Sequence, residues 1–550
     1  MKFFTQKNLV IALFLVFLFL RLFVDKTSMF FGGDSLKFLE TAKRFPYHTL
    51  YNNQLYLLHP PFYPYTIYFF NLTFQQDHIA GIVLSLVSSI ITFFILYRFF
   101  MMLTDNFNIT FFVLLFFTLS VGFIEASHIV FRESYVIMLA LSALYFYAKG
   151  VRFNSRKSII ASSVFSGLLA MTSDHVIFLI PAIVLSYIIF NSKKIEFKKL
   201  IFPNLKYAIL PLIIAALFYG SWTLIKYAQY SKHENYPNGY AGMPLSTHDL
   251  GLPQAFLPQF FEDYDGPKMG SDLIAAVKRI SFNIGYMLNM QPFPIPKGLN
   301  FTTMKFLLKP VHILYMIIVY IPLALLAIYG FMLSIKETIK WKKIHDNINL
   351  YMIFSFFIFA SPILQKLTNP RYMYIAYLFF FYFMSYGLVS LIGKIKSLQI
   401  HSKVIPAIII SLLILVPFWY YKNPHIVVFN KKIAAAQNTA DFIKKNLPKD
   451  AGIMAQGYSV ELIYLTGNRV IGLYSKPEKL MNMVSHYNIS YIVLTERFND
   501  YFHLSEKSAD FVRNNPSKFK LVATIKEDYS GFYSEDDPAR TDEVYVYKIV

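Results

Sequence analysis

The chain has 550 residues, of which 55% are hydrophobic and 15% are charged, and its mean hydropathy is +0.44. Soluble domains carry more charge, about 25% of their residues. Several apolar runs also reach the length of about 20 residues that a helix needs to cross a bilayer. These properties exclude an ordinary soluble protein and predict a polytopic α-helical membrane protein.

A formal net charge of +20 would suggest nucleic-acid binding in a soluble chain. Here the lysines gather in short loops between apolar runs, as at residues 193–199 and 336–343. Short loops rich in lysine remain in the cytoplasm, so membrane topology explains the charge and no nucleic-acid partner is expected. The sequence has no cysteine, which excludes disulfides, thiolate catalysis and cysteine-ligated metals.

The apolar runs predict about eleven transmembrane helices. In chain order they occupy residues 8–24, 79–100, 110–124, 128–148, 158–171, 176–191, 207–225, 311–335, 350–364, 371–392 and 404–421. The first helix is retained, because no small-residue cleavage site follows Arg21. With the lysine-rich loops inside, the N-terminus is cytoplasmic and the C-terminal part is outside. The composition is typical of an AT-rich prokaryote, so the plasma (inner) membrane is expected.

This topology divides the chain into a transmembrane domain over residues 1–423 and an extracytoplasmic domain over residues 424–550. The first outer loop covers 25–78 and an outer insertion covers 226–309. The aromatic, proline-rich segment 60–74 is expected to lie in the membrane interface, where tyrosine is favoured. In the last domain short apolar strands alternate with helices, which predicts a small α/β domain with a largely parallel sheet. No glycine-rich phosphate motif accompanies it, so no nucleotide is expected.

Asp34 is the first candidate for chemistry. It follows a Gly-Gly pair in the loop after the first helix. A carboxylate just outside the membrane can coordinate a divalent cation or deprotonate an acceptor hydroxyl. The alternative is a solvated loop aspartate that follows a tight turn.

Arg132 and Glu133 are the second candidate, because they lie within the apolar register near the outer end of the fourth helix. A charge at helix depth costs a few kcal/mol, roughly 2.5–3.5, unless it is paired or lines a wet cavity. The pair is therefore either part of a functional cluster with His128 and Glu125, or a mutual or interhelical salt bridge.

Four other residues stand at positions where substrates can reach them. Asp174 and His175 occupy the turn of a helical hairpin, which a bare turn would also explain. Arg371 opens a late helix, where a guanidinium can clamp a phosphate or anchor the helix at headgroups. His59 can bind a phosphate or a metal, or merely cap the proline run that follows it. No serine-hydrolase, zinc-protease or P-loop motif occurs.

Three features in this order resemble the GT-C superfamily of polytopic glycosyltransferases. The first is an acidic residue in the first outer loop, here Gly33-Asp34-Ser35. The second is the stretch His59-Pro60-Pro61-Phe62-Tyr63-Pro64, and the third is a C-terminal outer α/β domain. The resemblance spans nearly the whole chain. It is closest to the branch that includes protein O-mannosyltransferases and the aminoarabinose transferases of lipid A.

This resemblance implies an inverting transfer of a sugar from a polyprenyl-phosphate donor to an acceptor, without a nucleotide sugar. By position, Asp34 is then the catalytic base or the ligand of a divalent cation, and Glu133 is the second acidic residue. His59 occupies a position often held by a lysine that contacts the lipid phosphate, and Tyr63 belongs to the same motif. A neutral histidine is a weaker partner for an anion than lysine.

Other positions depart from or follow the family pattern. Thr172-Ser173 matches a Thr-Lys pair whose lysine is missing here, and Arg371 matches an Arg-Tyr pair at the start of a late helix. The donor phosphate is expected to contact Arg371, with Arg132 or His59. Further expected substrate-binding residues are His128, Asp174 and His175. The Trp-Trp-Asp motif of oligosaccharyltransferases is absent, which disfavours en bloc transfer to asparagine.

Two other classes of function remain open at this point. A transporter predicts charges at mid-membrane and broken central helices, whereas the acidic candidates here lie at helix ends. A membrane-anchored binding or assembly protein predicts that the carboxylates of Asp34 and Glu133 do not converge. The motifs do not specify the sugar, the acceptor (lipid, glycan or protein) or the need for a metal.

Overall fold

The computed structural model describes residues 6–23, 32–47, 60–191, 205–232, 321–341, 347–361, 373–397, 436–456, 462, 465–473, 477–486, 488–495, 503–527 and 543–550. By its contacts the chain divides into two compact units. The helical unit comprises Met1–Lys26, Ile82–Trp222 and Asp265–Asn423. The sheet unit comprises Thr27–Gly81, Thr223–Tyr264 and Pro424–Val550.

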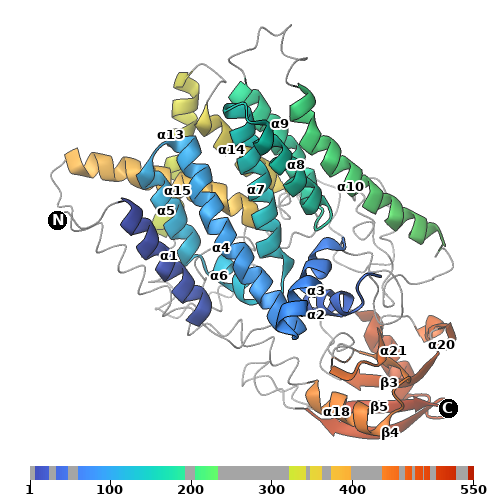
Figure 1. The fold of residues 1–550 in the computed structure, drawn as a ribbon. Coiled ribbons are helices and arrows are strands. Elements are labelled where there is room, and N and C mark those ends of the chain that lie inside the picture. The colour runs from blue at the N-terminus through green and yellow to red at the C-terminus, as the bar shows by residue number, and fades with distance from the viewer. Residues whose placement is uncertain are drawn as a thin grey trace, which may run out of the picture. The chain divides into compact units, whose positions relative to one another are not determined.

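Apolar helices make up the helical unit (Figure 1), and the unit boundaries at residues 81/82 and 222/223 fall within α4 and α10. The helices are α1 (Gln6–Phe23), α4 (Asp77–Thr104), α5 (Phe107–Leu119), α6 (Val121–His128), α7 (Arg132–Arg152), α8 (Arg156–Ala170), α9 (Val176–Asn191), α10 (Leu205–Lys232), α13 (Ile321–Trp341), α14 (Ile348–Ala360) and α15 (Tyr374–Ser397).

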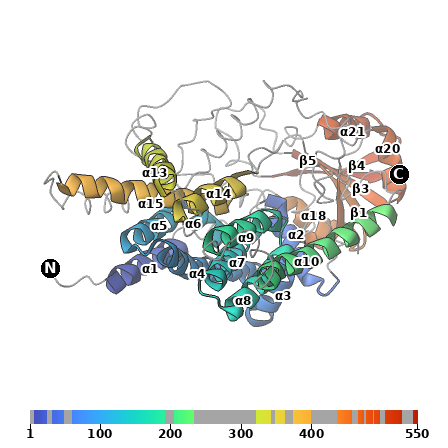
Figure 2. The ribbon, with the colours of Figure 1, turned by 90° about the horizontal axis from the view of Figure 1, so that it is seen from above.

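Helix α7 is the most enclosed element of this unit. It packs against α8 and α9, as Figures 1 and 2 both show, and nearly all of its side chains are buried. Helix α15 is a second central helix of this unit and packs against α5, α13 and α14. A helix that is apolar all round needs such enclosure by other helices or by lipid.

Within the described residues, four helices are long and apolar enough to cross a membrane, and the bent pair α5–α6 would make a fifth. The four are α4, α7 and the segments Pro322–Lys340 and Tyr374–Lys394. Shorter apolar helices lie at 176–190, 209–225 and 348–360. The polytopic helical class is therefore supported. The count of about eleven spans stays a prediction, because the segment at 404–421 and part of that at 311–335 lie outside the described residues.

Two predictions about the first half of the chain were wrong. A single helix was predicted over 110–124, but the structure has two helices, α5 and α6, which meet at 70°. Ser120 between them has an extended backbone, with φ −66° and ψ 116°, and so interrupts the helix.

A loop was predicted around Asp34, but the structure places this residue in the first turn of helix α2 (Gly32–Lys43). This helix buries Phe38, Leu39 and Ala42, and the Phe38 ring meets Tyr63 of α3 (Phe62–Phe74) edge-on at 5.0 Å. Apolar side chains spaced three and four residues apart give a short segment a reason to be helical.

The C-terminal part folds as an α/β layer structure. Its elements are α18 (Gln437–Asn446), β1 (Gly452–Ala455), β2 (Arg469–Gly472), α20 (Pro477–His486), β3 (Ile489–Thr495), α21 (His503–Arg513), β4 (Phe519–Lys526) and β5 (Glu543–Ile549). The strand order is β2-β1-β3-β5-β4. Strand β1 pairs in parallel with β2 and β3, whereas β5 pairs antiparallel with β3 and β4. The sheet is therefore mixed, and the prediction of a largely parallel sheet holds only for the β1–β3 half.

Alternation along the strands builds the two faces of this sheet. Ile453, Ala455 and Val493 pack in one cluster with Ala440 and Ile443 of α18. The intervening residues of β1 and β3 pack in a second cluster with α20 and α21. Successive strand residues point to opposite faces, so one short strand supplies both cores.

Glu527, just after β4, is buried and holds the start of α18. Its Oε1 accepts hydrogen bonds from the Thr439 backbone N–H at 2.6 Å and from the Thr439 hydroxyl at 2.5 Å. Thr439 lies in the first turn of α18, where N–H groups have no partner inside the helix. Burial raises the pKa of Glu527, and the hydrogen bonds from Thr439 and Asn438 oppose that rise only in part.

Replacing Glu527 with alanine is expected to destabilise α18 by about 1 kcal/mol, the usual cost of a lost helix cap. Faster amide hydrogen exchange over residues 437–446 would report it. Because the pKa of Glu527 is raised, its stabilising contribution is full below the ordinary value of 4.5 and is lost as pH rises through the raised pKa. Glu527→Gln keeps an acceptor but cannot titrate. The same pH dependence in that variant, after correction for intrinsic exchange, would contradict this assignment.

Candidate functional site

The candidate site lies in the helical unit, where α7 begins. Phe131 has an extended backbone and precedes the first turn of α7, so Arg132 and Glu133 are the first two helical residues. Arg132 is 4% exposed and Glu133 is 2% exposed. The N-terminus of a helix carries a partial positive charge. The helix N-terminus therefore stabilises a negative charge on Glu133, although both side chains are almost fully shielded from solvent.

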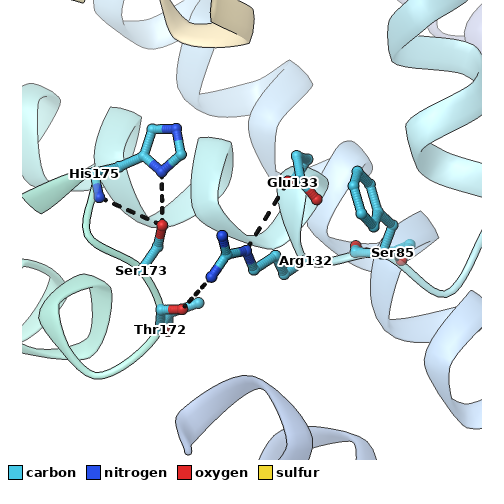
Figure 3. A network of polar contacts seen from close by, with 7 residues as sticks. Ser85, Arg132, Glu133, Thr172, Ser173 and His175 are labelled. Atoms are coloured by element: carbon cyan, nitrogen blue, oxygen red, sulfur yellow. Dashed lines mark hydrogen bonds and ion pairs between the residues drawn. The ribbon is translucent and has the colours of Figure 1, made fainter. Parts of the chain in front are cut away.

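Arg132 and Glu133 form a buried ion pair, with Arg132 Nε 3.9 Å from a carboxylate oxygen of Glu133. Arg132 Nη1 also donates to the Thr172 carbonyl at 3.5 Å, and Figure 3 shows its side chain between these two partners. Charge-assisted hydrogen bonds are normally about 2.7–2.9 Å long. Both of these contacts are longer than that.

The turn between α8 and α9 supplies the opposite wall of the site. Thr172, Ser173 and His175 are buried in it. Ser173 Oγ lies 2.6 Å from His175 Nδ1, and the His175 backbone N–H donates to the same oxygen at 3.4 Å (Figure 3). These contacts fix the turn that presents the Thr172 carbonyl to Arg132.

Asp174 lies in the same turn and is half-buried. Tyr219 of α10 hydrogen-bonds to this carboxylate. The Asp174 Oδ1 atom is buried and has no hydrogen-bond partner within the geometric limits among the described residues. Asp174 therefore adds a carboxylate to the turn between α8 and α9, with Tyr219 of α10 as a partner.

The junction between α6 and α7 is fixed by short polar contacts. Ser85 Oγ of α4 donates to the Ile129 carbonyl at 2.8 Å and lies 3.3 Å from the Phe131 carbonyl. Ser134 Oγ donates to the Ala126 carbonyl at 2.8 Å. These bonds satisfy backbone groups that the break in the helix exposes, and they fix the direction in which α7 starts.

Of the site residues expected from the sequence, the structure brings Arg132, Glu133 and the turn with Asp174 and His175 into one neighbourhood. His128 ends α6, and its Nδ1 bonds to the Ile124 carbonyl at 2.6 Å, which orients the ring along its own helix.

Tyr63 lies in the sheet unit with its ring fully buried, so its role as a substrate contact stays a prediction. The Asp34 and Glu125 side chains, His59 and Arg371 lie outside the described residues. The convergence of Asp34 with Glu133 is therefore still a prediction. The described part of the chain holds no cluster of three or more metal-ligating side chains. A divalent cation at Asp34 likewise stays a prediction.

Sequence analysis missed Ser85 and Tyr219. Serine is common in apolar helices, and only its place beside the break between α6 and α7 gives Ser85 a role. Tyr219 is one of many aromatic residues in this chain, and its pairing with Asp174 depends on how α10 packs.

Residues 58–222 match the family described as dolichyl-phosphate-mannose-protein mannosyltransferase. The matched segment is less than a third of the chain, and it contains Arg132, Glu133 and the turn at 172–175. No curated protein sequence matches the chain significantly.

Among solved structures, ArnT from Cupriavidus metallidurans bound to undecaprenyl phosphate has a TM-score of 0.58 at 10% identity, over 99% of each chain. The chain shares the fold of ArnT. ArnT in the apo state gives a TM-score of 0.57 at 10% identity, over 98% of this chain and 97% of ArnT.

The oligosaccharyltransferase of Archaeoglobus fulgidus gives a TM-score of 0.49 at 12% identity, over 90% of this chain and 70% of its own, which is too distant to carry an argument. The GT-C resemblance predicted from the sequence is thereby confirmed, and the family match supports the glycosyltransferase class.

Removing one partner of the Arg132–Glu133 pair should lower the stability of the protein more than removing both. Glu133→Leu leaves a buried guanidinium without its carboxylate, which is expected to cost about 3–5 kcal/mol. The double variant Arg132→Leu/Glu133→Leu is expected to recover most of that loss. Thermal unfolding of the purified protein in detergent measures both.

The exposed pair Glu337–Lys340 of α13 provides the matched control for this cycle. Glu337→Gln should change stability by no more than about 0.5 kcal/mol. A double variant of the buried pair that is as unstable as the sum of its two single variants would contradict the coupling.

Proposed function

We propose that this chain transfers a sugar from a polyprenyl-phosphate donor to an acceptor at the outer face of the plasma membrane, with inversion at the anomeric carbon. The observation that carries the proposal is the buried Arg132–Glu133 pair inside the segment that matches a mannosyltransferase family. Similarity over the whole chain to a structure that holds undecaprenyl phosphate supports the class of donor.

Arg132 is assigned to the donor phosphate. A guanidinium stays charged and offers several N–H donors in one plane, which suits a phosphate. Its existing contacts, at 3.9 Å and 3.5 Å, are long enough to be exchanged for shorter ones to a phosphate oxygen. Arg371 and His59, predicted from the sequence as further phosphate contacts, belong to the same proposal.

The reaction itself needs a carboxylate near the acceptor. The acceptor oxygen attacks the anomeric carbon on the face opposite the phosphate, and its proton passes to a carboxylate. The bond from the anomeric carbon to the phosphate oxygen breaks, and polyprenyl phosphate leaves with the electron pair. Phosphate is a fair leaving group, so positioning and charge stabilisation supply most of the rate.

Asp34 is proposed as the base, directly or through a divalent cation, and Glu133 as the second acidic residue of the centre. Glu133 balances Arg132 while the donor is absent. When the phosphate binds Arg132, Glu133 is released to orient the acceptor hydroxyl. Asp174 and His175, in the facing turn, and His128, at the end of α6, are proposed to line the substrate path.

The remaining parts of the chain are proposed to select the acceptor, which is a lipid, a glycan or a protein. These parts are the outer insertion at residues 226–309 and the C-terminal domain at residues 424–550. In this proposal the N-terminus is cytoplasmic and the C-terminal domain is extracytoplasmic, so donor and acceptor meet on the outer side.

Kinetics on a panel of polyprenyl-phosphate sugars tests these roles in purified protein. Glu133→Gln is expected to lower kcat about 100-fold, because a misoriented acceptor hydroxyl disturbs the reacting geometry, with little change in KM. Arg132→Lys is expected to raise the KM for the donor about tenfold, because lysine lacks the planar set of donors. Glu337→Gln, on the exposed face of α13, should behave as wild type.

Other results would contradict parts of the proposal. Full transfer activity in Asp34→Asn would remove the base assignment and leave Glu133 as the remaining carboxylate. Wild-type protein that neither transfers nor hydrolyses any donor of the panel would favour the binding or assembly protein over the enzyme.

A further inference from the structure

Arg21, near the end of α1, is the most deeply buried cation among the described residues. It is 2% exposed, although it lies in an apolar helix. The guanidinium carbon lies 3.7 Å from the centre of the Phe17 ring and 5.2 Å from that of Phe117. A permanent charge at this depth is costly unless other groups satisfy it, so its partners show what it does.

Arg21 donates hydrogen bonds to α4 and to the end of α5. Arg21 Nε donates to Ser89 Oγ at 3.1 Å. Nη1 donates to the Thr118 carbonyl and Nη2 to the Phe117 carbonyl, both at 3.3 Å. The last carbonyls of a helix have no partner in their own helix and carry its partial negative charge. Arg21 therefore caps the C-terminus of α5 from a different helix.

That cap lies at the break between α5 and α6. The two helices meet at 70°, and Ser120 between them is extended. The Ser120 N–H still bonds to the Phe116 carbonyl at 3.0 Å, which leaves the next carbonyls to find partners outside the helix. Arg21 supplies partners for the carbonyls of Phe117 and Thr118, so the bend does not leave these groups unsatisfied in an apolar interior.

Helix α4 holds α6 at both of its ends. Ser89 contacts Arg21 at the break before α6, and Ser85 bonds to the Ile129 and Phe131 carbonyls at the break after it. Residues four apart lie on one face of a helix, one turn from each other. Ser88 and Thr92 differ, because each bonds back to a carbonyl of α4 itself. One face of α4 thus fixes the short helix that leads into Arg132 and Glu133.

We propose that Arg21 is a positioning residue for the Arg132–Glu133 centre. It fixes the bend between α5 and α6, and with Ser85 and Ser89 it sets where and in which direction α7 starts. The part of this inference that concerns catalysis rests on the proposed transfer reaction. The part that concerns the bend rests on the contacts of Arg21 alone.

The test compares Arg21→Met, Arg21→Lys and Ser89→Ala with wild type in lipid nanodiscs. Amide hydrogen exchange is measured over residues 116–131 and over the hairpin at 156–191. Exchange reports local opening of each segment. Arg21→Met is expected to speed exchange over 116–131 about tenfold or more and to leave the hairpin within about twofold of wild type. Arg21→Lys, which keeps the charge and fewer donors, should be intermediate.

Turnover is measured on the same samples. Arg21→Met is expected to lower kcat about tenfold or more, with the donor KM within about twofold, because misplacing a group disturbs the reacting geometry rather than uniform binding. Ser89→Ala should show a smaller loss of the same kind.

Three outcomes would overturn the inference. One is unchanged exchange over 116–131 in both Arg21 variants. The second is equal loosening of all helices, which would make Arg21 a general stabiliser. The third is local loosening with wild-type kcat. Failure of the proposed function is distinct from these, because wild type itself would then show no turnover. The exchange comparison would still decide the role of Arg21 at the bend.

Discussion

The structure depends on burying Arg21, Arg132 and Glu133 while giving each charged group an ion-pair or hydrogen-bond partner. Arg132 is balanced by Glu133 and by a carbonyl of the facing turn. Arg21 is balanced by two carbonyls at a helix end and by a serine. In a low-dielectric interior an unpaired charge is expensive. Both arginines lie at breaks in helices, where backbone carbonyls without a partner in their own helix can accept hydrogen bonds from the guanidinium groups.

These breaks explain how an apolar helix can begin with buried charged groups. In a continuous helix from residue 107 to residue 152, the backbone N–H and C=O groups would hydrogen-bond to one another within the helix. Instead α5, α6 and α7 form three pieces, and α7 starts inside the bundle with a carboxylate and a guanidinium in its first turn. Irregular backbone at such depth is tolerated where protein surrounds it, and serines of α4 and α7 satisfy it here. The site is thus a consequence of how the break is stabilised.

Much of this was predictable from the sequence, because apolar periodicity decides most of a membrane chain. The hairpin at 158–191, the helix carrying Arg132 and Glu133, and the short strands at 453–455 and 491–494 all agree with the structure. Charges in an apolar register pointed directly to the Arg132–Glu133 pair. The bend at Ser120 was missed, because the segment is largely apolar and Gly122, the glycine at the break, also occurs inside helices. The role of Arg21 was missed for a related reason, since its partners are backbone carbonyls about 100 residues away, which no local pattern reveals.

The central claim is that Arg132 exchanges its contact with Glu133 for the phosphate of a polyprenyl donor. A cryo-electron-microscopy structure of the protein in nanodiscs with undecaprenyl phosphate tests it most directly. The account predicts density for the phosphate within hydrogen-bond distance of the Arg132 guanidinium, about 2.7–2.9 Å, with the separation from Glu133 increased. A phosphate bound elsewhere, with the Arg132–Glu133 pair unchanged, would contradict it and would make the pair a purely structural element of α7.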